Sequence, residues 1–287
     1  MNLTLERITT NIGAIVREID LRRVQTADEV GFVRQALVTH GVVFFRDQDV
    51  NLDQFWAFLQ QFGHPQREEI GGTDHDRPEQ VQTGDMSLSR YSTNTWHADT
   101  TSLGRPPMAT ALRAVAPPEF GGDTCWASMY AAWDALTEPV KRMLDGLTAV
   151  HSIRPTAETM QAYGQTFLAN YEALHGGDQV HPVVVTHPES GRKALFISEC
   201  FTTRIVELSP PESEAVLGML VRHIQRPDFT MRWKWRANDI AVWDNRCTQH
   251  FAVPDYTDAR VMQRIVLAGA RPGDGTVPAP QVEVAAG

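Results

Sequence analysis

The most informative segment of this chain is Asn94-Thr-Trp-His-Ala-Asp-Thr100. Side chains in an extended strand alternate between two faces, so His97 and Asp99 are predicted to project from the same face. One imidazole and one carboxylate on one face supply two neighbouring positions in the coordination sphere of a metal ion. Because short His-x-Asp motifs are common by chance, a hydrogen-bonded pair at a strand end is the structural alternative.

A third candidate ligand, His250, lies at the end of Trp243-Asp-Asn-Arg-Cys-Thr-Gln-His250. It follows a predicted strand and precedes a Pro-Asp turn, where a side chain can point into the mouth of a barrel. Together with His97 and Asp99 it would complete a facial triad that leaves three coordination positions open. Non-haem Fe(II) oxygenases require this arrangement. Taken alone, His250 could equally be a structural histidine.

Two arginines follow in Arg260-Val-Met-Gln-Arg264. The planar guanidinium fork binds a carboxylate through two hydrogen bonds and stays charged when desolvated. If this segment is a strand, the spacing of four returns both side chains to one face, toward the cavity that His250 enters. Thr124 could add a hydroxyl donor to the same carboxylate. The alternative is an ordinary pair of surface arginines.

The distribution of apolar residues predicts many short strands with a few helices between them, as in a mainly β jelly-roll barrel with flanking helices. Alternating or continuous apolar runs predict the strands, and helical spacing predicts the helices, with Thr26 as the N-cap of one. The predicted strands are Leu3 to Ile8, Ile15 to Ile19, Gly41 to Gln48, Met108 to Ala114, Gly122 to Ser128, Val183 to His187, Leu195 to Ile197, Phe229 to Trp235, Ile240 to Asp244 and Val261 to Ala268. The predicted helices are Asp28 to His40, Leu52 to Phe62, Met129 to Leu136, Glu138 to Leu147 and Pro211 to Gln225.

The 287 residues suit a single domain, which we expect to span residues 1–271. Within it, residues 67–95 are polar and lack periodicity, so we expect an active-site loop there. Residues 129–180 are expected to form a helical insert. Residues 272–287 are expected to be an irregular tail.

The net charge of −9 disfavours nucleic acid or an anionic membrane as a partner. No apolar run approaches the length of a membrane span, and the N-terminus lacks a secretion signal, so a cytoplasmic location is expected. The three cysteines, Cys125, Cys200 and Cys247, are widely spaced. We expect buried free thiols in a reducing compartment.

Four motifs, taken in order, resemble the taurine/dichlorophenoxyacetate dioxygenase family. They are WHADT, GGDTCW, WDNRCTQH and the RxxxR that follows, and the resemblance runs from about Ile8 to Arg271. Each motif is weak alone, and the four in order are specific. The resemblance implies a double-stranded β-helix and an oxygenase that uses Fe(II), with 2-oxoglutarate and O2 as cosubstrates.

Carried over position by position, the resemblance implies that His97, Asp99 and His250 are the iron ligands and form the catalytic centre. Arg260 would bind the distal carboxylate of 2-oxoglutarate with help from Thr124. Arg264 matches a second arginine, which lies near the cosubstrate and contacts the anionic group of sulfonate substrates. Trp243 and Asn245 match positions interpreted as structural support.

The resemblance departs at the substrate end. His75 is the best candidate for a substrate-binding histidine, and an exposed loop histidine is the alternative. Thr93 stands where taurine users carry a substrate-binding asparagine, which argues against taurine. Two segments, residues 128–133 and 187–193, look closest to the aryloxyalkanoate and alkylsulfate branches. The expected reaction is hydroxylation of a small, anionic organic substrate (sulfonate, alkyl sulfate or aryloxyalkanoate) with release of succinate and CO2.

Two other classes of function compete with this interpretation. A metal-dependent hydrolase would use the same triad but would give Arg260, Arg264 and Thr124 no role. A non-catalytic small-molecule-binding protein on the same barrel would not need an intact site. The family also implies a homo-oligomer, either a dimer or a tetramer.

Overall fold

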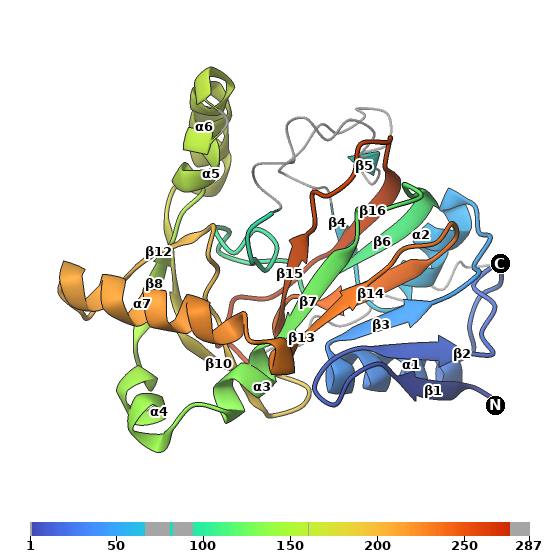
Figure 1. Ribbon diagram of the computed structural model, residues 1–287, viewed down its shortest axis with the longest axis horizontal. Helices are drawn as coiled ribbons and strands as arrows, with labels where there is room; N and C mark the ends of the chain where they lie inside the picture. The colour runs from blue at the N-terminus through green and yellow to red at the C-terminus, as the bar shows by residue number, and fades with distance from the viewer. Residues whose placement is uncertain (1, 67–80, 83–93, 160, 276–287) are drawn as a thin grey trace, which may run out of the picture.

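Two facing β-sheets form the centre of the computed structural model, which describes residues 2–66, 81–82, 94–159 and 161–275 (Figure 1). The larger sheet contains, in spatial order, β1 (Thr4–Arg7), β2 (Ala14–Arg17), β3 (Val42–Phe45), β14 (Ile240–Asp244), β6 (Ala109–Ala116), β16 (Val261–Leu267) and β4 (Pro65–Gln66), and β5 (Val81–Gln82) also pairs with β16. The smaller sheet contains β13 (Thr230–Trp233), β7 (Thr124–Ser128) and β15 (Thr248–Ala252).

The strand β3 shows why a continuous apolar run was predicted to be buried. Val43 and Phe45 belong to the core between the larger sheet and the helices α1 (Ala27–His40) and α2 (Leu52–Gln60). Val42 and Phe44 point the other way, into the core between the two sheets. A strand covered on both faces needs apolar residues at every position.

The helix α1 begins where the sequence predicted. The side chain of Thr26 accepts a hydrogen bond from the backbone N–H of Glu29, and the Glu29 side chain accepts one from the backbone of Thr26. This capping box satisfies N–H groups that a helix start otherwise leaves without partners. The helix ends at Gly41, whose φ of +72° lies in the left-handed region that glycine adopts readily.

The inner face between the two sheets carries the candidate site. Trp126 of β7 and Trp243 of β14 both face this space, where aromatic residues from the two sheets pack together. His250 of β15 lies directly opposite Trp126 in the strand pairing, and directly opposite residues point to the same face. Thr124 is two positions along β7 from Trp126 and therefore shares that face.

The remaining elements lie mainly beside the smaller sheet, on the left of Figure 1, whereas α1 and α2 lie on the right. The small strands form two further sheets, one of β10 (Val184–Thr186) with β11 (Lys193–Leu195), the other of β12 (Thr202–Ile205), β8 (Thr148–His151) and β9 (Gln179–Pro182). The helices are α3 (Met129–Asp134), α4 (Glu138–Leu144), α5 (Arg154–Thr159), α6 (Gln161–His175) and α7 (Pro210–Ile224), with a short 3-10 helix at Pro227–Phe229.

Most predicted elements are present with small shifts at their ends, and the mainly β architecture with flanking helices is confirmed. The expectation for residues 129–180 needs correction, because β8 and β9 lie among the helices of that region. The strands β12 and β15 were also missed. These four strands have 4 or 5 residues and carry polar side chains, so they show little apolar alternation.

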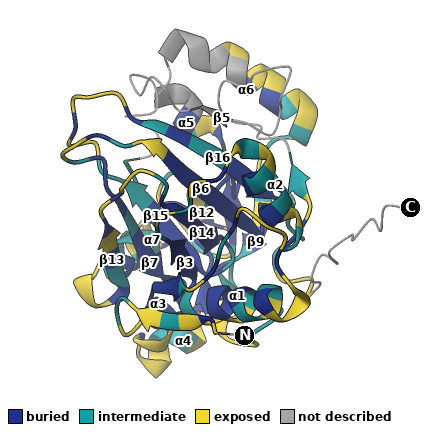
Figure 2. Ribbon diagram, turned by 90° about the vertical axis from the view of Figure 1, so that its right-hand side faces the viewer, coloured by how far each residue is buried: buried dark blue, intermediate teal, exposed yellow. Residues whose placement is uncertain are grey.

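The central strands of both sheets are buried, and exposed residues gather on the peripheral helices and turns (Figure 2). Within the described residues, no helix combines the length and the apolar character needed to cross a membrane. The three cysteines are free thiols, as expected, but only Cys247 is fully buried; Cys125 and Cys200 are partly exposed.

Candidate metal and cosubstrate site

Three predicted ligands, His97, Asp99 and His250, lie together on the inner face of the barrel. Each offers one ligand atom, and these atoms all lie within 4.8 Å of one another. Oδ1 of Asp99 is 3.5 Å from Nε2 of His250 and 4.0 Å from Nε2 of His97. The main chain fixes the two histidines, because each backbone N–H donates to the carbonyl of the other, at 3.0 and 2.7 Å. Residues far apart in sequence thus supply two imidazoles and a carboxylate to one point.

The local conformation around Asp99 differs from the predicted strand. Only His97 forms a bridge, to His250, and the chain then enters a turn in which Thr100 has a φ of +40°. The backbone N–H of Asp99 donates to Oδ1 of Asn245, at 3.2 Å, and not to a neighbouring strand. The chain is therefore not a regular strand through Asp99, although His97 and Asp99 lie together.

The tautomer of His97 is set by the hydrogen bond that its Nδ1 makes. Nδ1 lies 2.7 Å from the carbonyl oxygen of Thr95, which can only accept a hydrogen bond. Nδ1 therefore carries the proton, and the lone pair of Nε2 faces Asp99. Histidines that bind metals commonly donate their other N–H in this way. For His250, Nδ1 is buried and has no hydrogen-bond partner among the described residues.

The surroundings favour the protonation states that bind metal ions. Burial lowers the pKa of His97, and burial together with His97 lowers the pKa of His250 to about 3. Burial alone would raise the pKa of Asp99, but the Arg264 guanidinium, the two imidazoles and the Thr110 hydroxyl hold that pKa well below its usual range. Two neutral imidazoles and an ionised carboxylate are the ligand forms that a divalent cation needs.

The two predicted arginines have different partners. Arg264, on β16, places Nη2 2.6 Å from Oδ1 of Asp99. Arg260 lies immediately before β16 and is 5% exposed. Its Nε donates to the carbonyl of Gly122 at 3.1 Å, and its Nη2 lies 3.4 Å from Oγ1 of Thr124. The spacing argument placed both arginines on one strand, and the structure places only Arg264 there.

Burial lowers the pKa of Arg260 from its usual value, because the charged form is desolvated. The two groups to which Arg260 donates are neutral oxygens. A buried guanidinium held in this way is suited to bind a ligand carboxylate through its fork.

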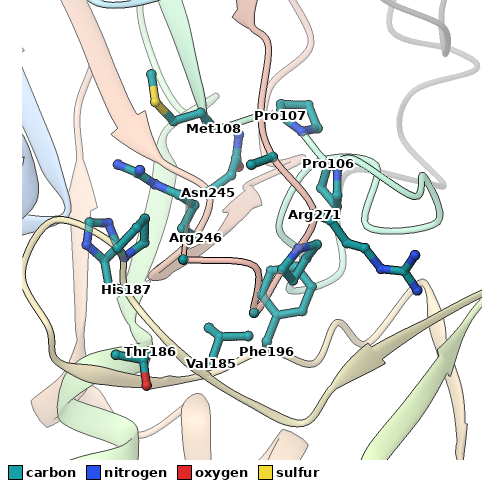
Figure 3. Close-up of a pocket in the computed structure, with 15 residues that line it drawn as sticks. Pro106, Pro107, Met108, Val185, Thr186, His187, Phe196, Asn245, Arg246 and Arg271 are labelled. Atoms are coloured by element: carbon teal, nitrogen blue, oxygen red, sulfur yellow. The ribbon is translucent and has the colours of Figure 1, made fainter. Parts of the chain in front are cut away.

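The two candidate substrate residues, His75 and Thr93, lie outside the described residues. A further pocket includes Asn245 in its wall (Figure 3). None of the three predicted metal ligands lines it. Its walls come from residues 106–108, 185–188, 196, 245–246, 270–273 and 275.

Sequence reasoning missed one polar residue in contact with the site, Thr110, whose hydroxyl donates to Oδ2 of Asp99. A single threonine within an apolar strand belongs to no sequence motif that would identify it as a site residue. Only its contact with Asp99, 11 positions away along the chain, marks it.

Comparison with known proteins agrees with this geometry. Residues 4–266 match the family model described as "Taurine catabolism dioxygenase TauD, TfdA family". The chain is 35% identical to an alkylsulfatase of Acinetobacter baylyi, over 93% of this chain and 85% of that protein. It is also 35% identical to an alpha-ketoglutarate-dependent sulfate ester dioxygenase of Pseudomonas putida, over 95% and 91% of the respective chains.

Among solved structures, a taurine dioxygenase from Burkholderia xenovorans superimposes with a TM-score of 0.81 and 35% identity. The match covers 95% of this chain and 91% of that one. The likeness extends across both sheets and the helical region, so it is not confined to the four motifs. The chain therefore belongs to the TauD, TfdA family and is a 2-oxoglutarate-dependent dioxygenase.

Proposed function

We propose that this dioxygenase uses Fe(II) and hydroxylates a small organic anion of the sulfate ester, sulfonate or aryloxyalkanoate type, with release of succinate and CO2. The observation that carries the proposal is the convergence of His97, Asp99 and His250 within 4.8 Å. The names of the two relatives described above, each 35% identical, favour sulfate esters as the first substrates to test.

The donor set fits a ferrous ion. Two imidazole nitrogens and one carboxylate oxygen lie within 4.8 Å of one another, and this is the donor set of the 2-His-1-carboxylate oxygenases. When bound together with 2-oxoglutarate, the iron supplies the chemistry that activates O2. The protein's own contribution is to hold the three ligands in place and to keep their protonation states fixed.

Arg260 and Thr124 are proposed to hold the distal carboxylate of 2-oxoglutarate. Oγ1 of Thr124 accepts a hydrogen bond from Nε1–H of Trp235 at 3.0 Å and faces Nη2 of Arg260. Because the oxygen is already accepting, its own proton remains available to a carboxylate. The cosubstrate would then receive a hydroxyl donor and a guanidinium fork from one wall of the barrel.

Arg264 is proposed to contact the anionic group of the substrate, with His75 and Thr93 as further substrate contacts. The Arg264 side chain is 19% exposed and already reaches Oδ1 of Asp99, so it borders the metal site. An anionic substrate drawn to this guanidinium would lie beside the metal ligands. Exclusion of water by the substrate would strengthen these charge interactions.

The hydrolase alternative accounts for the triad but gives the buried pair of Arg260 and Thr124 no role. The non-catalytic alternative is disfavoured because both the triad and this pair are intact. Metal analysis combined with 2-oxoglutarate binding separates the three classes. Only the proposed oxygenase consumes 2-oxoglutarate when a substrate is present.

The decisive experiment measures succinate formation by purified protein supplied with Fe(II), ascorbate, 2-oxoglutarate and O2. The panel covers alkyl sulfates, alkylsulfonates and aryloxyalkanoates, and Asp99→Ala serves as the inactive control. We expect substrate-dependent succinate, with sulfate esters as the best substrates. If no member of a broad panel stimulates succinate formation above the control, the proposed function is wrong.

Arg260→Ala tests the cosubstrate assignment separately. Breaking a desolvated charge pair costs on the order of 2–5 kcal/mol, so the apparent KM for 2-oxoglutarate should rise by at least about 30-fold. Arg226→Ala, at an exposed arginine paired with Asp228, is the control and should leave KM unchanged. An unchanged 2-oxoglutarate requirement in Arg260→Ala would refute this role.

We further propose that residues 1–271 act as one domain and that the protein is a cytoplasmic homo-oligomer, either a dimer or a tetramer. The three free cysteines are consistent with a reducing compartment. Sedimentation equilibrium of the purified protein measures the oligomeric state, and a monomer at micromolar concentration would contradict this part of the proposal.

A further inference from the structure

A chain of hydrogen bonds lies directly behind the carboxylate of Asp99. Nε1–H of Trp243 donates to Oδ1 of Asn245 at 3.1 Å, and Nδ2–H of Asn245 donates to Oγ1 of Thr110 at 2.9 Å. The Thr110 hydroxyl then donates to Oδ2 of Asp99 at 2.6 Å. Oδ1 of Asn245 also accepts the backbone N–H of Asp99 at 3.2 Å. This chain therefore holds both the main chain and the side chain of Asp99.

The direction of the chain is fixed by chemistry. An indole N–H can only donate, so the amide oxygen of Asn245 faces Trp243 and its NH2 group faces Thr110. The Thr110 oxygen accepts from that NH2 group and keeps its own proton for the ionised carboxylate of Asp99. A hydroxyl donating to a carboxylate at this distance is a strong, charge-assisted hydrogen bond.

The backbone around Thr110 leaves little freedom to move. Thr110 is fully buried on β6, opposite Trp243 of β14 and Val266 of β16, so its strand is paired on both sides. The backbone N–H of Asn245 donates to the carbonyl of Met108 at 2.9 Å. Thr110, which donates to Asp99, and Asn245, which accepts from it, are therefore both held by the paired strands of the larger sheet.

The two oxygens of Asp99 consequently face different surroundings. Oδ2 receives the Thr110 hydroxyl, whereas Oδ1 faces Nε2 of His250 at 3.5 Å and Nε2 of His97 at 4.0 Å and is paired with Nη2 of Arg264 at 2.6 Å. The Thr110 hydrogen bond occupies Oδ2, so Oδ1, the oxygen that faces both imidazoles, is the ligand atom, and a bound cation would compete there with the Arg264 guanidinium. Single-oxygen ligation leaves more of the coordination sphere for cosubstrates than binding through both oxygens does.

We propose that Thr110 is a positioning residue for the metal site: its hydroxyl engages Oδ2 of Asp99, so that only Oδ1 is presented to the cation. This inference rests on the proposed function, because it concerns the same metal site. Hydrogen-bond partners of this kind orient metal ligands, and their loss typically weakens metal binding by about 10–100-fold.

The test measures Mn(II) affinity of the metal-free protein, without 2-oxoglutarate or substrate, by the electron paramagnetic resonance signal of unbound Mn(II). Thr110→Val removes the hydroxyl at nearly constant shape, and Thr110→Ser restores it. Thr248→Val is the matched control, because Thr248 is a buried threonine whose hydroxyl donates to the carbonyl of Asp244 at 2.7 Å. We expect the Kd to rise about 10–100-fold in Thr110→Val and to stay near wild type in the other two variants.

A purely structural role for Thr110 would lower thermal stability in Thr110→Val and Thr248→Val alike without changing the Kd of either. A wild-type Kd in folded Thr110→Val would therefore overturn the inference while leaving the proposed function intact. If Thr110→Val does not fold, the smaller Thr110→Ala carries the same test with the same expected rise. Failure of the wild-type protein to bind Mn(II) at all would count against both the proposed function and this inference.

Discussion

Two buried clusters in the described part of the chain have the composition of a metal site, and their hydrogen bonding separates them. The first is the triad of His97, Asp99 and His250. The second, which we call the structural cluster, consists of His187, Asp244 and Cys247, whose ligand atoms also lie within 4.8 Å of one another. All six residues are buried, so proximity and burial do not distinguish the clusters.

In the structural cluster, hydrogen bonds occupy the lone pairs of His187 and Asp244. Nδ1 of His187 accepts the backbone N–H groups of Glu189 and Ser190, so the proton sits on Nε2, which donates to Oδ2 of Asp244 at 3.0 Å. Both oxygens of Asp244 also accept hydrogen bonds from the guanidinium of Arg246. In the triad both oxygens of Asp99 also have partners, Thr110 and Arg264. The contrast lies in the imidazoles, because the Nδ1–H of His97 points to the carbonyl of Thr95 and leaves Nε2 open.

The thiol of the structural cluster reinforces this contrast. Burial raises the pKa of Cys247 well above its usual value, so the sulfur stays protonated, whereas metal ions bind the thiolate. The difference teaches that a metal site is defined by available lone pairs, which depend on where each proton is held. The structural cluster is a satisfied ion-pair network that joins loop and strand segments.

The largest expected difference between the clusters is in turnover and metal content. His97→Ala should lose 2-oxoglutarate turnover with substrate to the background level and should lose bound metal, while keeping its far-ultraviolet circular dichroism spectrum. His187→Ala should still bind one equivalent of Mn(II). A folded His97→Ala protein with full turnover, or a folded His187→Ala protein without metal, would reverse the two assignments.

The next effect is on stability and concerns Asp244. Asp244→Asn removes the main counter-charge of the largely buried Arg246 guanidinium. Loss of one partner of a buried ion pair typically lowers the free energy of unfolding by about 3–5 kcal/mol. Asp134→Asn, at an exposed ion pair with Arg192, should cost less than about 1 kcal/mol. Urea denaturation of both variants gives the two free energies of unfolding, and equal values would show that the Asp244 network does not act as a buried pair.

Metal binding should stabilise the fold through the triad alone. Mn(II) at 100 times its Kd should raise the free energy of unfolding by about 2.7 kcal/mol, because the ion binds the folded state. This gain should vanish in His250→Ala and persist in Cys247→Ser. Thermal or chemical unfolding with and without Mn(II) measures it, and loss of the gain in Cys247→Ser would indicate that the structural cluster binds metal.

Per pH unit, the smallest effect is a pH dependence at His151, which supports the turn after Asp99. Nδ1 of His151 lies 2.9 Å from Oγ1 of Thr101, and its ring packs against His181 and Phe196. Burial, together with His181, lowers the pKa of His151 to about 3, from 6.5. As the pH falls from 6.5 to 3, His151 becomes protonated in the unfolded chain but stays neutral in the folded protein. The free energy of unfolding therefore decreases over that range.

The expected slope for this one group is up to about 1.4 kcal/mol per pH unit. The free energy of unfolding of metal-free protein, measured by urea denaturation at a series of pH values, should fall less steeply in His151→Gln than in wild type. Identical slopes would show that His151 titrates normally in the folded protein.

Much of the fold followed from local patterns. The continuous apolar run was sufficient to predict β3, because a strand buried on both faces is apolar at every position. The helical spacing of apolar residues and the capping threonine were sufficient to predict α1, because a helix buried on one face repeats its apolar residues with the helical period. The strand β15 was missed although it carries His250, since Thr248, Gln249 and His250 are consecutive polar residues and show no apolar alternation. The turn at Thr100 was missed because the bond that replaces strand pairing comes from Asn245, 146 positions from Asp99.

The sequence alone determined which chemical groups this protein could bring to a metal ion and a carboxylate, because residue identity fixes a side chain's ligand atoms and charge. Only the tertiary structure decided which groups are available. The hydrogen bond of Thr110 to Asp99 and that of His187 to Asp244 come from other segments, whereas the tautomer of His97 is set locally by the carbonyl of Thr95. The hydrogen-bonding groups nearest in space determine which atom of a side chain carries a proton. For these side chains, several of those groups come from distant parts of the chain.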